Sequence, residues 1–200
     1  MRGIFRRHGA RASALTVLAV LLGACAGRIP RANGTSADTT GATLGAMPLT
    51  TVYPLESTGA PPPDTTVTIT AGVPRAIELR HSPPDNALFA EITFDSASFP
   101  ASAGRTVEVH VTPRPGAYNL TVQSSIPFTS AQLRFAYPVH FFAPAAARTR
   151  YGSDLAVERA LAIGRLEAGV VTFLPSVRPA TDNISAAIAG PGTYLVAAPQ

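Results

Sequence analysis

The stretch Thr106-Val107-Glu108-Val109-His110-Val111-Thr112 decides the fold class, because polar and apolar residues alternate along it without a break. Successive side chains of a β-strand point to opposite faces, so a period of two predicts a half-buried strand. Its three valines would form the buried face, and the other residues would face solvent. One or two such strands are marginally stable at best, so this one predicts partner strands with the same pattern.

The same alternation recurs on both sides of this stretch. Turn-forming residues separate the runs, as in Pro113-Arg114-Pro115-Gly116. Many short strands at this spacing indicate a sandwich or a barrel. We therefore predict an all-β fold, an antiparallel β-sandwich of Ig-like or jelly-roll-like type, over residues 65–200. The other expected strands are 65–71, 77–80, 90–95, 118–123, 131–137, 170–174, 184–188 and 194–196.

Residues 155–167 fit two kinds of secondary structure. The alanines and the Glu158-Arg159 pair suit a helix. Val157 and Ile163 also fit a strand, and residues 167–169 read as a hairpin turn before the next strand. We favour a strand pair here, and the helix stays open as the alternative.

Residues 25–64 have the composition of a flexible tether. They are rich in Ala, Gly, Thr, Ser and Pro and contain few large apolar residues. Such a segment buries too little apolar surface to offset the entropy lost on ordering. We therefore expect it to be disordered and to link the sandwich to whatever precedes it. A short stretch, Leu49 to Leu55, could instead dock on the domain as an added edge strand.

The first 24 residues have the layout of a secretory signal peptide. Four arginines lie in a basic head, and an apolar stretch runs from Ala12 to Leu22. An apolar stretch of this length is too short to span a bilayer as a helix. The chain continues as Leu22-Gly23-Ala24-Cys25, and Cys25 is the only cysteine in the sequence.

These four residues resemble the lipobox of bacterial lipoproteins. The resemblance implies cleavage between Ala24 and Cys25, and a diacylglyceryl group on Cys25 that attaches the protein to a membrane. With Cys25 lipidated, no cysteine remains for a disulfide, so packing alone must hold the fold. Ala26 carries no acidic retention signal. In a cell with two membranes we therefore expect the outer membrane rather than the inner one.

The charge of the mature chain excludes some partners. Four of the 16 basic residues precede Cys25, and those that remain balance the 12 acidic residues. A neutral protein lacks the basic surface that nucleic acid requires, so nucleic acid is not an expected partner. It also lacks a polybasic patch for anionic lipid, so membrane attachment would depend on the lipid at Cys25.

Two groups of residues are weak candidates for ligand binding. Glu108 and His110 share one strand face and could hold a metal or orient a substrate, although a solvated sheet face is the ordinary interpretation. Arg148, Arg150 and Tyr151 could contact an anionic polysaccharide through guanidinium hydrogen bonds and a stacking ring, or could form a solvated loop. We expect His140 to be packed among aromatic residues. No catalytic, metal or cofactor motif stands out in the sequence.

Near the C-terminus, Ile184-Ser185-Ala186 and then Gly192-Thr193-Tyr194-Leu195-Val196 look like a closing hairpin. The earlier segment Phe135-Ala136-Tyr137-Pro138-Val139 looks like a central strand. Together these residues resemble the β-sandwich that binds spectrin in ankyrins. The resemblance covers residues 107–197. It implies a binding or structural module rather than an enzyme.

Two functions are compatible with these features. The first is a lipid-anchored, non-enzymatic β-sandwich of the cell envelope, which would present a surface to an envelope protein or a polysaccharide. The second is an envelope hydrolase whose active site is assembled from strand ends, because catalytic groups meet in space rather than in sequence.

Overall fold

The computed structural model describes residues 39–40, 45–138 and 143–200. These residues belong to one compact unit. Ala24, Cys25 and His140 lie outside the described residues, and so do the expectations placed on them. No helix in the described part of the chain is long and apolar enough to cross a membrane.

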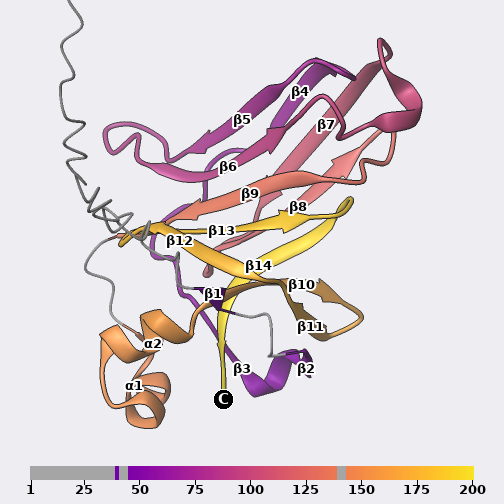
Figure 1. The fold of residues 1–200 in the computed structure, drawn as a ribbon. Helices are drawn as coiled ribbons and strands as arrows, with labels where there is room; N and C mark the ends of the chain where they lie inside the picture. The colour runs from indigo at the N-terminus through magenta and orange to yellow at the C-terminus, as the bar shows by residue number, and fades with distance from the viewer. Residues whose placement is uncertain (1–38, 41–44, 139–142) are drawn as a thin grey trace, which may run out of the picture. The chain divides into compact units, whose positions relative to one another are not determined.

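The described residues form two antiparallel sheets packed face to face, which confirms the all-β sandwich (Figure 1). We call these two layers sheet A and sheet B. The order in sheet A is β1 (Thr39–Thr40), β12 (Ser176–Ala180), β13 (Asn183–Ile188), β9 (Ala131–Ala136), β6 (Leu88–Phe94) and β5 (Arg75–Arg80). The order in sheet B is β2 (Ala46–Pro48), β11 (Val170–Phe173), β10 (Ala162–Glu167), β14 (Gly192–Pro199), β8 (Asn119–Ser124), β7 (Thr106–Pro113) and β4 (Thr65–Thr70).

The alternation that predicted β7 matches its burial in the structure. Val107, Val109 and Val111 are fully buried between the sheets, and Glu108 is exposed on the opposite face. Phenylalanines from several elements fill the same core because aromatic side chains bury a large apolar area each. The fully buried aromatic residues include Phe89, Phe94, Phe99, Phe128, Phe135 and Tyr194.

The chain passes between the sheets at β13 and β14. The resemblance to ankyrin sandwiches implied a closing hairpin here, but β13 pairs with β9 and β12 in sheet A, and β14 pairs with β10 and β8 in sheet B. Residues 190–192 therefore form a corner between sheets and not a hairpin turn. The physical reason is the burial of Tyr194 and Val196, which face the core from sheet B.

The expectation of a strand pair over residues 155–167 is wrong in its first half. Helix α2 (Asp154–Ala160) is followed directly by β10, and α1 (Ala145–Tyr151) precedes it. The side chain of Ser153 accepts a hydrogen bond from the Ala156 amide and caps α2, and such a cap favours helix over strand. The predicted turn at 167–169 does join β10 to β11.

The tether does not extend to residue 64. A short 3-10 helix, η1 (Leu49–Thr51), and strand β3 (Val52–Pro54) lie against the domain, and β3 pairs with the end of β14. The expected docking of Leu49 to Leu55 on the domain is therefore confirmed, but only residues 52–54 form the added strand. Val52 and Leu55 are buried, and this apolar burial offsets the entropy cost of ordering the segment.

Strand β14 consequently carries apolar side chains on both faces. Tyr194, Val196 and Ala198 belong to the core between the sheets. Leu195 and Ala197 belong to a second, smaller cluster on the other side of sheet B. This second cluster consists of Val52, Ala162, Val171, Phe173, Leu195 and Ala197, with Met47, Leu49 and Leu166 packed against it.

Candidate functional site

A cavity of about 520 Å³ lies at one end of the sandwich, and we call it the end cavity. The elements around it are the β5–β6 loop, the start of β8, the end of β9 and the start of β13. Its lining residues are His81, Asp85, Ala87, Leu88, Tyr118, Arg134, Ala136, Tyr137, Pro138, Asp182 and Asn183.

A row of aromatic rings forms the floor of the end cavity. The His81 ring meets Phe89 edge-on with centroids 5.5 Å apart, and Phe89 stacks on Tyr118 at 5.1 Å. Tyr118 in turn meets Tyr137 in a T-shaped contact at 6.4 Å. These distances are those of favourable aromatic pairs, so the floor is a packed extension of the core.

The two phenols of this floor are held in their neutral form. Burial, followed by the charge of Asp85, raises the pKa of Tyr118 to about 12. Burial and the neighbouring Glu158 carboxylate raise the pKa of Tyr137 as well, and its hydroxyl donates to Glu158 Oε1 at 3.2 Å. Both groups are phenols at neutral pH; the Tyr137 hydroxyl already donates to Glu158, and the Tyr118 hydroxyl can donate and accept hydrogen bonds.

The charged groups of the end cavity do not cancel. Arg134 Nη2 is paired with Glu91 Oε2 at 3.0 Å, so the Glu91 carboxylate, which does not line the cavity, largely offsets the arginine charge. Asp85 and Asp182 line the cavity as well, and Asp182 Oδ1 accepts a hydrogen bond of 2.5 Å from the Asn183 amide. Among the described lining residues, the two carboxylates of Asp85 and Asp182 therefore outweigh the one arginine.

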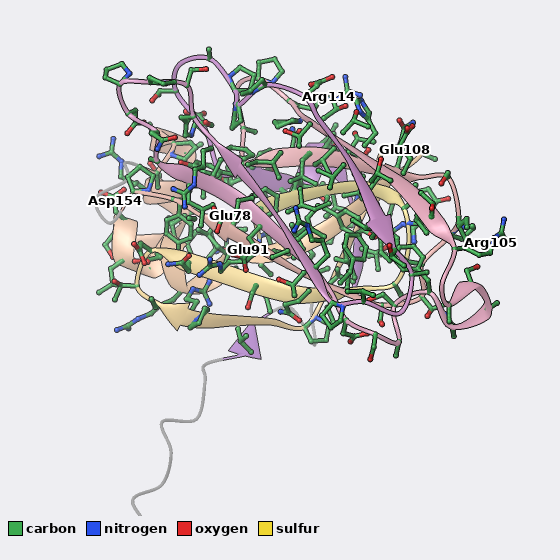
Figure 2. The ribbon with its side chains drawn as sticks, turned by 90° about the horizontal axis from the view of Figure 1, so that it is seen from above. Glu78, Glu91, Arg105, Glu108, Arg114 and Asp154 are labelled. Carbon is green, nitrogen blue, oxygen red and sulfur yellow. The ribbon has the colours of Figure 1, made fainter. Side chains whose placement is uncertain are left out.

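The outer face of sheet A next to the cavity carries a ladder of paired charges. Glu78 and Glu91 are direct cross-strand neighbours, and Figure 2 shows them side by side. Like charges in that register repel each other. Arg80 binds Glu78 at 2.9 Å and Arg134 binds Glu91, so each carboxylate has its own cation. This pairing keeps Arg134 fixed at the cavity edge.

The structure places Glu108 and His110 together on the outer face of sheet B, away from the end cavity. The two ring nitrogens of His110 contact hydroxyls, Nδ1 with Thr66 Oγ1 at 2.7 Å and Nε2 with Thr112 Oγ1 at 3.0 Å. A nitrogen in such a hydrogen bond is not free to bind a metal. Within the described ranges, no three His, Cys, Asp or Glu residues are placed to hold a metal ion.

Arg148, Arg150 and Tyr151 all lie on α1. The Tyr151 hydroxyl donates to the Pro199 carbonyl at 2.7 Å, which fastens the helix to the end of β14. Arg148 Nε lies 3.9 Å from Asp154 Oδ1, and Arg150 is exposed. The tyrosine ring therefore has a structural role in this arrangement.

None of the residues that line the end cavity was a site candidate from the sequence, because they come from separate turns and strand ends. The only local signal is the position of Tyr118 and Tyr137, each next to a strand terminus and a proline-containing turn. Comparison with known proteins finds no matching family model, no matching curated protein and no matching solved structure.

Proposed function

We propose that the protein is a lipid-anchored, non-enzymatic binding module of the cell envelope, and that the end cavity is its binding site. The signal-like residues 1–24 and the lipobox-like sequence before Cys25 support the anchor. The balanced charge of the remaining chain supports attachment by lipid rather than by basic residues.

The observation that carries the binding role is the composition of the end cavity. It combines buried aromatic rings with a few convergent polar groups, which is the usual composition of small-ligand sites. Its phenols are neutral at physiological pH, so they suit hydrogen bonding to a ligand better than proton abstraction.

One observation favours the alternative of an envelope hydrolase. His81, Asp85 and Asp182 line the same cavity, and a histidine with carboxylates is a common acid–base set. Turnover of an envelope substrate, abolished by His81→Asn and retained by the matched change His110→Asn on the other sheet, would support that alternative and contradict the non-enzymatic role.

The anchor and the binding role need separate experiments. Labelled fatty acid should be incorporated into the native chain and not into Cys25→Ala, and the mass of the native product should begin at Cys25. Label on both chains or on neither would contradict the anchor.

To test the binding role, Ala87 is replaced by a photoreactive residue, and the protein is photo-crosslinked in intact cells. Ala87 is exposed and lines the end cavity. The control position is Val73, which is 57% exposed and does not line the cavity. Adducts from position 87 and not from position 73 are expected. Equal labelling of the two positions, or none, would contradict a binding role for the end cavity.

A further inference from the structure

We infer that the end cavity binds a neutral or amine-bearing saccharide unit and discriminates against acidic saccharides. This inference rests on the proposed binding function and adds the chemical class of the ligand. It is carried by three properties of the cavity, namely its size, its pattern of hydrogen-bonding groups and the sign of its charge.

The volume and the floor suit a sugar ring. A cavity of about 520 Å³ has room for one or two pyranose rings and lies in the usual range for small-molecule sites. The rings of His81, Tyr118 and Tyr137 provide apolar surface for the C–H groups of a sugar. Because these rings pack on one another and on Phe89, little side-chain entropy is lost when a ligand binds.

The polar groups suit a ligand whose hydroxyls both donate and accept. Asp85 and Asp182 only accept, the Arg134 guanidinium only donates, and the Tyr118 phenol and the Asn183 amide do both. An apolar ligand would displace water from these groups without replacing its hydrogen bonds, at a cost. Neighbouring hydroxyls of a saccharide can satisfy groups of both kinds in one site.

The sign of the charge separates classes of saccharide. Because Glu91 offsets Arg134, the carboxylates of Asp85 and Asp182 dominate the wall. Among the described lining residues a uronate would meet these carboxylates and an arginine that is already paired, and that repulsion selects against it. An ammonium group would be attracted instead.

The test uses three trisaccharide probes with the purified full chain, namely chitotriose, its de-N-acetylated form and trigalacturonate, measured by isothermal titration calorimetry. Tyr118→Phe removes one hydroxyl and keeps the ring on Phe89, and Asp85→Asn changes an exposed loop residue without removing bulk. Glu108→Gln, on the exposed face of sheet B, is the matched control. Circular dichroism verifies that each variant is folded.

We expect one of the two chitin-derived probes to bind most tightly and trigalacturonate most weakly. Tyr118→Phe should weaken the preferred probe about fivefold, which corresponds to one lost hydrogen bond, and the control should not. Asp85→Asn should narrow the difference between the de-N-acetylated probe and trigalacturonate. Tightest binding of trigalacturonate, no binding of any probe, or equal affinity in all variants would overturn the inference.

The outcome also separates this inference from the proposed function. Suppose that no saccharide binds, but the photoreactive residue at position 87 still forms adducts and protease treatment removes them. The end cavity is then a binding site for a protein, and only the inferred saccharide ligand is wrong. If neither the titrations nor the adducts give a signal, both the inference and the binding role of the end cavity are wrong.

Discussion

The phenol of Tyr194 donates a hydrogen bond of 2.5 Å to the backbone carbonyl of Gly190, across the corner that joins β13 to β14. This contact resembles the tyrosine corner of other β-sandwiches, in which a tyrosine near the start of a strand binds the backbone a few residues upstream. Gly190 has a φ of +146°, a conformation that side chains rarely adopt, so glycine is required there. The two residues together fix where the chain changes sheets.

Replacement of Tyr194 by phenylalanine tests this corner. The ring would still fill the core, but the buried carbonyl of Gly190 would lose its partner, at a cost of about 1–3 kcal/mol. Urea unfolding should show that decrease in the free energy of unfolding. Tyr53→Phe is the control, because no hydrogen bond involves the Tyr53 hydroxyl within the described ranges. Equal stability of Tyr194→Phe and the native chain would show that the hydrogen bond does not stabilise the corner.

Arg178 stabilises the C-terminal end of α2. Its Nη2 donates to the backbone carbonyls of Glu158 and Leu161 at the end of the helix, where the Glu158 carbonyl also accepts from the Leu161 amide. We expect Arg178→Ala to lower the free energy of unfolding by on the order of 2 kcal/mol, since hydrogen bonds from a charged donor are lost.

Thermal unfolding of Arg178→Ala is compared with Arg105→Ala, whose side chain is exposed on the loop before β7 (Figure 2). Arg178→Lys should recover only part of the loss, because an ammonium cannot reproduce the planar guanidinium fork. A melting temperature unchanged from Arg105→Ala would contradict the capping role.

Alkaline pH should destabilise the fold through its tyrosines. The pKa of Tyr118 is 10.0 in the unfolded chain and about 12 in the folded one, so the unfolded state releases its proton first. The stabilisation is therefore complete below pH 10 and is lost as pH rises toward 12. For Tyr118 the loss is on the order of 1–2 kcal/mol after screening by solvent.

The measurement is urea unfolding at several pH values between 9 and about 12. Burial raises the pKa of Tyr137, Tyr151 and Tyr194 in the same direction, so the native chain should lose more stability than one tyrosine explains. Tyr118→Phe should show a shallower decline. The same slope in both chains would contradict the environment described for Tyr118.

Gly164 in β10 faces the second apolar cluster, where a β-carbon would overlap Cγ1 of Val171 on the neighbouring strand. We expect Gly164→Ala to destabilise the protein by about 1–3 kcal/mol through overpacking. Val171→Ala should relieve that overlap in the double variant. A double-mutant cycle measured by urea unfolding should therefore give a favourable coupling of at least about 0.5 kcal/mol, and strict additivity would contradict the close approach.

The strands from 65 to 136 were predictable from the sequence because each has one buried and one solvated face. Polar residues alternate with the buried Val107, Val109 and Val111 because successive side chains of a strand point to opposite faces. The secondary structure around Leu161 was harder to predict. A seven-residue helix and a strand meet there, and both carry apolar residues at short spacing. The cap at Ser153 was the stronger local signal.

The end cavity could not be predicted, because its position depends on tertiary contacts. Tyr118 and Tyr137 fit the alternating pattern as ordinary core residues, and both are buried. Only their approach to His81 and to Asp182, from other strand ends, makes them the floor and wall of a cavity. The alternation of polar and apolar residues along each strand does not show which strand ends lie together in the folded protein.

The pairing of the early strands β2 and β3 with β11 and β14 affects how the protein can be made. Residues 46–54 find their partners only at 170–172 and 197–199, more than 100 residues later in the chain. Contacts of such long sequence separation slow folding, because the loop must close before they form. Strands β2 and β3 can therefore complete sheet B only after the last residues of the domain are available, while local pairs such as β5 with β6 need no such delay.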